Sequence, residues 1–241
     1  MTALPRAILF DLDDTILSFG RRSLVIEEIA ERTPALFSPL SPGAVAQAIE
    51  ARFTAFWADA ERHKAWRQHL AEARRMLVAE AFEDLNAAGA PGLTAEQAHA
   101  FADQFSAYRE AEAKFFPGAL ETLDALKARG VRLALVTNGE ARAQRDKVER
   151  FDLARRFDHV QIEGEHGFGK PEDRAYRHAM SALGVEAHET WMVGDNLEWE
   201  VAAPQALGIF AIWHDHLGDG LPAGSAIQPD RIIRSLTELL P

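Results

Sequence analysis

The feature that most restricts the fold of this chain is the alternation of short apolar runs with longer helical segments. Such runs lie at residues 7–10, 131–136, 159–162, 190–193 and 209–213. Their apolar character is continuous, which is typical of strands buried on both faces of a sheet. Helix-like segments separate the later four runs. We therefore predict an α/β fold: a doubly wound, Rossmann-like parallel sheet with right-handed crossovers.

The region between the first two runs has a different texture. Residues 17–116 contain no convincing strand run, and Ala, Glu, Arg and Gln dominate there, with apolar residues at helical spacing. Pro117-Gly118 marks the return of the α/β pattern. The sequence thus predicts an all-helical domain at 17–116, inserted into an α/β core made of residues 1–16 and 117–241.

Local signals predict some helix boundaries within this inserted region. Ser41 before a proline fits a helix N-cap, and Thr94 followed by Gln97 fits a capping box. Four apolar residues at steps of three and four predict one face of a single long helix. They are Trp66, Leu70, Ala73 and Leu77.

Charge and composition exclude several classes of function. Lys and Arg number 26 against 37 Asp and Glu, so the net charge is −11. Such a chain repels nucleic-acid backbones and anionic membrane surfaces, and we expect neither as a partner. Cysteine is absent, which excludes disulfides, zinc–thiolate sites and cysteine nucleophiles. The N-terminal residues do not resemble a signal peptide, and a cytoplasmic location is expected.

Polar clusters follow four of the predicted strands. Each cluster taken singly also fits an ordinary helix cap or surface loop. Because the carboxyl ends of parallel strands meet at one edge of a sheet, we expect the four clusters to converge. Three carboxylates, a hydroxyl and an ammonium at one edge suit magnesium-assisted phosphoryl transfer to an aspartate. The clusters are Asp11-Leu12-Asp13-Asp14-Thr15, Thr137-Asn138-Gly139, Gly169-Lys170-Pro171 and Gly194-Asp195-Asn196.

In motif order and spacing, the chain resembles the haloacid dehalogenase (HAD) superfamily. The signature of that superfamily is DxDx[TV] after the first strand, a Thr or Ser after the second, then a Lys, then an acidic Gly-Asp motif. The four clusters above match these motifs in turn, and the resemblance covers nearly the whole chain. The inserted helical region resembles the cap domain of one large, phosphatase-like branch.

The resemblance implies a role for each matching residue. Asp11 would be the nucleophile that forms an aspartyl-phosphate, and Asp13 would be the general acid and base. Magnesium would be held by Asp11, Asp13 and Asp195. The residues implied to bind phosphate are Thr137, Asn138 and Lys170.

One position departs from the family pattern. The acidic motif often carries a second Asp four or five residues after the first, and here Glu200 occupies that place. A glutamate there can accept a hydrogen bond from a metal-bound water or pair with Lys170. We therefore place Asn196 and Glu200 around the implied metal rather than on it.

Asp13 favours a phosphatase over a 2-haloacid dehalogenase, because an alcohol leaving group needs a proton and a halide does not. A phosphomutase with the same nucleophile stays open, since mutases share these motifs. A non-enzymatic phospho-receiver or binding module also uses clustered Asp and a Lys, but such modules are short and lack the insertion.

The predicted substrate is a small soluble phosphate monoester. Side chains of the inserted domain would recognise its leaving group. The competing interpretation is that these side chains form surface ion pairs or core contacts. The sequence predicts no particular oligomeric state. The candidate specificity residues are Arg21, Arg22, His63, Arg67 and Arg74.

Overall fold

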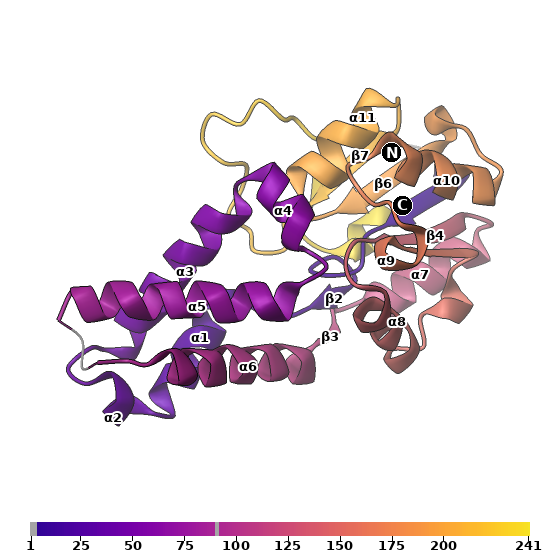
Figure 1. Ribbon diagram of the computed structural model, residues 1–241. Helices are drawn as coiled ribbons and strands as arrows, with labels where there is room; N and C mark the ends of the chain where they lie inside the picture. Colours follow the sequence, from indigo (N-terminus) through magenta and orange to yellow (C-terminus); the bar gives the residue numbers. More distant parts are fainter. Residues whose placement is uncertain (1–3, 90–91) are drawn as a thin grey trace. The chain divides into compact units, whose positions relative to one another are not determined.

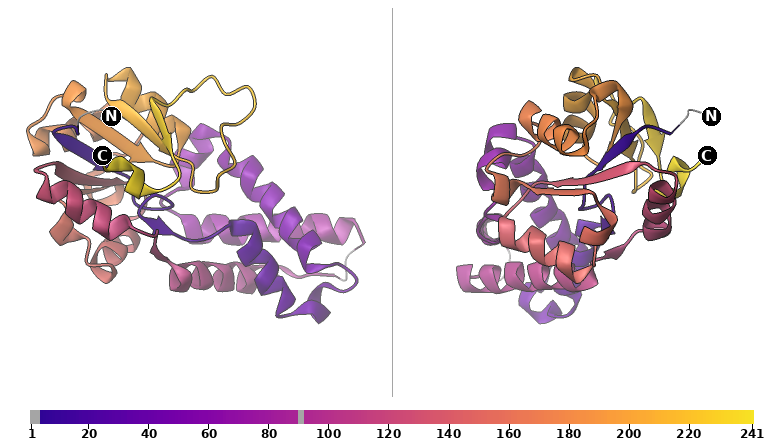
Figure 2. Two further views of the ribbon diagram at one scale, coloured as in Figure 1. Left: turned by 180° about the vertical axis from the view of Figure 1, so that it is seen from behind. Right: turned by 90° about the vertical axis from the view of Figure 1, so that its right-hand side faces the viewer.

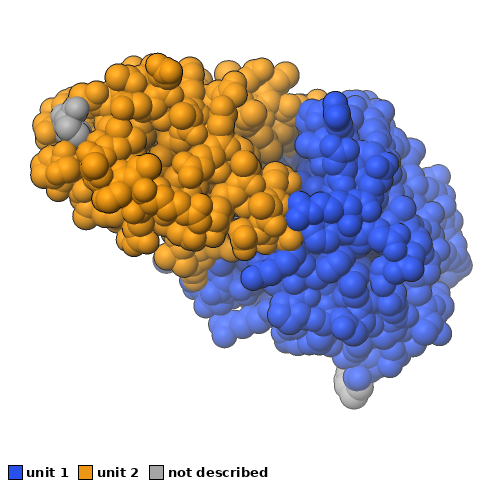
Figure 3. Space-filling view, turned by 90° about the horizontal axis from the view of Figure 1, so that it is seen from below, with its two compact units in different colours: residues 1–18, 114–241 blue, residues 19–113 orange. Residues whose placement is uncertain are grey.

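The computed structural model describes residues 4–89 and 92–241. Two compact units make up the chain, residues 1–18 with 114–241 and residues 19–113 (Figure 3). The first unit holds the sheet and the second is helical. These unit boundaries fall close to those expected from the sequence, and the role of the second unit as a cap stays a prediction.

A six-stranded, wholly parallel sheet forms the centre of the first unit, in the order β5-β4-β1-β6-β7-β8 (Figure 1). The doubly wound prediction is confirmed, and the five predicted strands agree with the observed ones to within one residue. Only β8 has no counterpart, because a three-residue run carries too little signal. The strands are β1 (Ala7–Phe10), β4 (Arg132–Thr137), β5 (His159–Ile162), β6 (Thr190–Gly194), β7 (Phe210–His214) and β8 (Arg231–Ile233).

Helices cover both faces of this sheet, as the edge-on view in Figure 2 shows. All four residues of β1 are fully buried, which explains why its sequence is apolar without alternation. Ala7 and Leu9 join a core cluster with Tyr176 and Met180 of one flanking helix. The flanking helices are α7 (Ala119–Ala128), α8 (Ala141–Arg150), α9 (Glu163–His166), α10 (Asp173–Leu183) and α11 (Ala203–Ala206).

Short elements complete this unit. A two-stranded antiparallel ribbon, β2 (Leu17–Ser18) with β3 (Lys114–Phe115), lies where the chain leaves the unit and where it returns. Strands of two residues could not be predicted from periodicity. The remaining turns of helix are η1 (Ala154–Arg156), η2 (Ala187–Glu189), η3 (Leu197–Ala202) and η4 (Leu236–Leu239).

The second unit is helical, as predicted. Ser41 caps its third helix by accepting the N–H of Ala44, and Thr94 with Gln97 forms the expected capping box. No helix in the described part of the chain is long and apolar enough to cross a membrane. The helices are α1 (Arg22–Glu31), α2 (Pro34–Phe37), α3 (Pro42–Trp57), α4 (Ala60–Trp66), α5 (Leu70–Ala87) and α6 (Ala95–Glu112).

The prediction of one long helix through Trp66 and Leu77 is wrong. Helix α4 ends at Trp66, and α5 begins only at Leu70 after a turn in which the N–H of His69 donates to the carbonyl of Trp66. The break lets the Trp66 ring meet Phe56 edge-on at 6.1 Å, while α5 packs against α6. Apolar spacing continues across the turn, so the sequence pattern did not reveal it.

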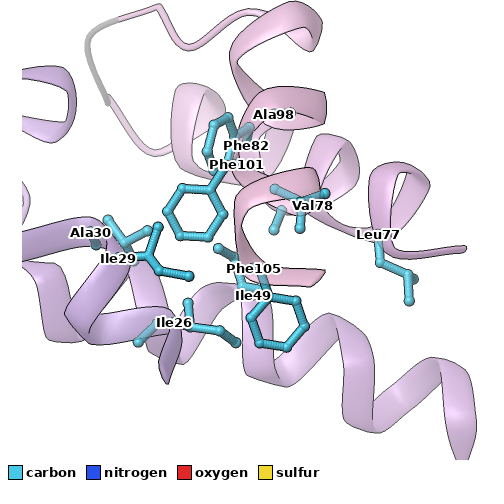
Figure 4. Close-up of a cluster of buried hydrophobic side chains, with 14 of the residues drawn as sticks. Ile26, Ile29, Ala30, Ile49, Leu77, Val78, Phe82, Ala98, Phe101 and Phe105 are labelled. Atoms are coloured by element: carbon cyan, nitrogen blue, oxygen red, sulfur yellow. The ribbon is translucent and has the colours of Figure 1, made fainter. Parts of the chain in front are cut away.

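Aromatic and aliphatic side chains together form the core of this unit (Figure 4). Phe82 contacts Phe37 and Phe101 with ring centroids 5.7 and 6.0 Å apart, in edge-to-face arrangements. Ile26 and Ile49 are fully buried beside them. Each such ring buries a large apolar area, so this helical unit has a hydrophobic core of its own.

Candidate active site

Two of the predicted carboxylates leave adjacent strands side by side. Phe10 pairs with Val193 across β1 and β6, and the N–H of Asp11 donates to the carbonyl of Val193 at 3.0 Å. Asp195 follows directly after β6. Strands β4 and β5 lie on one side of β1 and the later strands on the other, so the strand order reverses between β1 and β6. Ligands of doubly wound sheets bind at this point.

Lys170 joins two carboxylates in the interior. Its Nζ lies 2.6 Å from Oδ1 of Asp11 and 2.7 Å from Oε1 of Glu200, and the lysine is fully buried. The pairing of Glu200 with Lys170, left open by the sequence, is present in the structure. A buried ammonium in this position can also bind the negatively charged group of an anionic substrate.

The loop that carries Lys170 is fixed by Asn138. The Asn138 side chain donates to the carbonyl of Lys170 (2.7 Å) and accepts its N–H (2.9 Å). A Cβ on Gly169 would lie only 2.5 Å from Oδ1 of Asn138, so glycine is required for this close approach. Both polar ends of the Asn138 side chain therefore hold the backbone of Lys170.

A second glycine makes room for Glu200. A Cβ on Gly194 would lie 2.0 Å from Cγ of Glu200. The other oxygen of Glu200 accepts the N–H of Asn196 at 2.8 Å. The Asn196 side chain caps the following helical turn by accepting the N–H groups of Glu198 and Trp199. Asn196 therefore shapes the loop that presents Glu200 and Asp195.

The site carries an excess of buried negative charge. Burial raises the pKa of Asp11, although Lys170 opposes the shift, and burial raises the pKa of Glu200 to about 7. Burial, followed by the charges of Glu200 and Asp11, holds the pKa of Asp195 well above its usual value. Burial alone would lower the pKa of Lys170, but Asp11 and Glu200 raise it above its ordinary range. Three carboxylates share one ammonium, and a further cation would relieve their repulsion.

Asp13 has two partners that the sequence analysis missed. Lys147 Nζ lies 3.0 and 2.8 Å from the two oxygens of Asp13, and Gln144 donates to one of them at 3.0 Å. Gln144 also donates to the carbonyl of Asn138, which ties Asp13 to the second motif. The available signal was a polar pair three residues apart on the helix after that motif, since residues at that spacing share a face.

Replacing Lys147 by methionine should lower kcat on a phosphate monoester by about 10–100-fold with little change in KM. The ammonium holds both oxygens of Asp13, so its loss would misplace the predicted acid and base without touching Asp11, the predicted nucleophile. Steady-state kinetics measure the effect. Lys127→Met is the matched control, because Lys127 forms a comparable ion pair with Asp158 in the same unit. Equal losses in the two variants would contradict a positioning role.

The second motif is braced by another residue that the sequence analysis missed. Glu163, buried at the end of β5, accepts the N–H of Gly139 at 3.0 Å. Thr137 is the last residue of β4 and is also buried. Glu163 thus fixes the turn that follows Thr137, where the sequence predicted an oxyanion-binding hydroxyl.

All the predicted specificity residues belong to the second unit. Arg22 pairs with Glu50 at 2.5 Å and lies over a phenylalanine ring. Arg74 donates to Ser106 at 3.1 Å, and Arg67 is 4% exposed. Because α4 and α5 are separate helices, Arg67 and Arg74 do not lie on one face of a single long helix. Arg21 precedes α1 as its N-cap residue, and burial lowers the pKa of His63 to about 4. Their roles toward a substrate stay predictions.

Comparison with known proteins identifies the family whose model this chain matches and a relative of similar length. The model of the haloacid dehalogenase-like hydrolase family matches residues 5–208. A phosphoserine phosphatase from Thermus thermophilus is 33% identical, over 97% of each chain. This likeness spans both units.

Solved structures share the architecture. The HAD-hydrolase-type protein YfnB from Bacillus subtilis, solved bound to magnesium, aligns over 98% of this chain and 97% of its own, with 22% identity and a TM-score of 0.71. A 2-haloacid dehalogenase from Pseudomonas syringae is 26% identical over 98% of this chain and 96% of its own, with a TM-score of 0.57. Proteins that catalyse different reactions thus share this fold. The reaction of this chain therefore has to be inferred from its site residues.

Proposed function

Because this chain belongs to the haloacid dehalogenase-like hydrolase family and has phosphatase homologues, we propose that it is a magnesium-dependent phosphatase acting through an aspartyl-phosphate. The observation that carries the proposal is the buried Asp11–Lys170–Glu200 cluster beside Asp195, at the point where the strand order reverses. In this cluster the carboxylate of Asp11, the proposed nucleophile, lies 2.6 Å from a buried ammonium.

In the proposed first step, an oxygen of Asp11 attacks phosphorus and the bond from phosphorus to the leaving alcohol oxygen breaks. Lys170, 2.6 Å from Oδ1 of Asp11, orients the carboxylate and meets the negative charge of the phosphoryl group. Thr137 and the backbone N–H groups of its turn would bind the remaining phosphoryl oxygens. The product of this step is phosphorylated Asp11 and a free alcohol.

Asp13 would supply the proton for that alcohol. Carrying a proton on entry, it donates this proton to the leaving oxygen and becomes a carboxylate. The same carboxylate then takes a proton from water, whose oxygen attacks phosphorus, so that phosphate is released and Asp11 is restored. Lys147 and Gln144 hold Asp13 in place for both transfers. A halide leaving group would need no such acid, which is why we favour the phosphatase over a dehalogenase.

The residues present fit a magnesium ion. The ion would be held by the carboxylates of Asp11 and Asp195 and by the carbonyl of Asp13, all oxygen ligands of the kind Mg²⁺ prefers. Burial raises the pKa values of Asp11 and Asp195 even though Lys170 opposes both shifts, so a further cation would stabilise these carboxylates. When bound, the ion supplies charge neutralisation that lets an anionic substrate approach an anionic nucleophile. Members of this family generally use Mg²⁺.

We propose a small phosphate monoester as the substrate and the helical unit as the part that recognises its leaving group. The full-length likeness to a phosphoserine phosphatase makes phosphoserine the first compound to test. The candidate side chains of that unit are proposed to bind an anionic or zwitterionic leaving group. They are Arg21, Arg22, His63, Arg67 and Arg74.

A panel of phosphate monoesters, with and without Mg²⁺, tests this proposal. Phosphate release from at least one small ester is expected, most rapidly among amino-acid and sugar phosphates, and EDTA should abolish it. Transfer of phosphate to a sugar acceptor without net release would instead indicate a phosphomutase. Chloride release from a 2-haloacid would indicate a dehalogenase. Either outcome, or no turnover at all, would contradict the proposed function.

A further inference from the structure

Three histidines of the first unit gather at the open edge of the sheet. His159 lies on the edge strand β5, His166 on α9 and His178 on α10. One ring nitrogen from each lies within 4.8 Å of the other two. Strand β4 separates β5 from β1, so this cluster is distinct from the Asp11 site.

Hydrogen bonds determine which ring nitrogens carry protons. Nδ1 of His166 lies 3.0 Å from the carbonyl oxygen of Ile162, which can only accept, so Nδ1 is the donor. Nδ1 of His178 lies 2.8 Å from Oε1 of Gln161, whose amide nitrogen donates to the carbonyl of Ala175. The Gln161 oxygen is thus an acceptor too, and both histidines have a lone pair on Nε2.

The third histidine, His159, offers a third ring nitrogen, its Nε2. Nε2 of His159 is buried and has no hydrogen-bond partner among the described residues. A buried, unsatisfied ring nitrogen is costly unless another ligand meets it. Burial, and then the neighbouring His178 and His166, lower the pKa of His159, which favours the neutral ring that binds metals.

We propose that His159, His166 and His178 form a second metal site that binds a divalent transition metal, Zn²⁺ in particular, through their three Nε2 atoms. Imidazole nitrogens suit Zn²⁺ far better than Mg²⁺. A tetrahedral zinc site needs nitrogens about 3.3 Å apart, so small side-chain rotations would close the cluster. Gln161 and the Ile162 carbonyl orient two of the rings from behind, as outer partners do in known metal sites. Phe168 packs against His166 and His178 and gives the site an apolar wall.

The site would clamp the loop that carries Lys170. His159 and His166 precede this loop position and His178 follows it, so one ion would join β5, α9 and α10 around residues 167–172. We therefore expect Zn²⁺ to slow hydrogen exchange in that loop. This readout does not depend on catalysis.

The test is Zn²⁺ titration of metal-stripped protein, in excess Mg²⁺ so that the Asp11 site does not compete. One equivalent of Zn²⁺ should bind and raise Tm. The His178→Gln variant should bind it at least about 100-fold more weakly. The matched control is His188→Gln, which alters a histidine of the same unit outside the cluster, and Asp11→Asn should also keep the site.

Nitrogen NMR of the imidazole rings gives an independent readout on the wild-type chain. Three Nε2 resonances should shift together on addition of one equivalent of Zn²⁺, even if a histidine variant fails to fold. Unshifted resonances, or equal Zn²⁺ affinity in His178→Gln and the wild type, would mean that the three rings are packing contacts only, and the proposal would be wrong.

Discussion

Asp11→Asn should abolish hydrolysis of phosphate monoesters, with a loss of at least about 10⁴-fold in kcat. Asparagine keeps the shape of the side chain and an oxygen that can accept the hydrogen bond from Lys170, but its amide cannot act as the proposed nucleophile. The substitution also removes one of three carboxylates that share a single ammonium, so the folded structure should be retained or stabilised. Steady-state assays and urea unfolding measure the two effects separately.

The matched control for this variant is Asp14→Asn. Asp14 lies in the same loop with a positive φ of 57°, a conformation that asparagine also adopts readily. We expect it to lose less than about 10-fold in kcat, because no catalytic step is proposed for it. Rapid acid quenching followed by mass spectrometry should find phosphate on Asp11 in the wild type. Turnover by Asp11→Asn near the wild-type rate would rule out the aspartyl-phosphate route.

Lys170→Met should have the largest combined effect, a loss of about 10²–10⁴-fold in kcat/KM together with about 3–5 kcal/mol of stability. Methionine fills a similar volume but leaves the buried carboxylates of Asp11 and Glu200 without their shared ammonium. The raised pKa of Lys170 means that its ammonium stays charged at neutral pH and that its stabilising contribution is lost as the pH rises through that raised value.

The same variant should show a pH dependence of known sign. Burial raises the pKa of Glu200 to about 7 with Lys170 beside it, and loss of the ammonium raises this pKa further, so in the metal-free variant this carboxyl takes up a proton as the pH falls. A neutral Glu200 needs no ammonium beside it. The destabilisation by Lys170→Met should therefore be smaller at acidic pH than at pH values above 7, as measured by urea unfolding.

A double variant separates stability from catalysis. Adding Glu200→Gln to Lys170→Met removes one unpaired buried charge and should recover part of the lost stability, while activity stays low. The coupling energy between the two substitutions is the readout. Strict additivity of the two losses would contradict a direct Lys170–Glu200 interaction, and recovered activity would show that Lys170 has no role toward phosphate.

Local patterns in the sequence were sufficient to predict the sheet. Continuous apolar runs are buried on both faces, so five strands could be predicted to within one residue, and the caps at Ser41 and Thr94 follow from hydrogen bonds within three residues. The order of polar motifs after these strands also predicted that side chains such as Asp11 and Lys170 come together at the candidate site. Where an apolar pattern ran unbroken across a turn, as between Trp66 and Leu70, or where a strand was very short, local patterns carried no usable signal.

Tertiary structure alone decided which charges meet. Lys170 binds Asp11 across a sequence separation of 159 residues, and Lys147 binds Asp13 across 134. No periodic pattern in the sequence connects residues so far apart. The three histidines likewise come from a strand and two helices. Secondary structure follows from interactions between near neighbours, which the sequence displays directly. Side-chain pairing depends on how crossovers bring distant segments to one edge of the sheet, and only the folded chain contains that information.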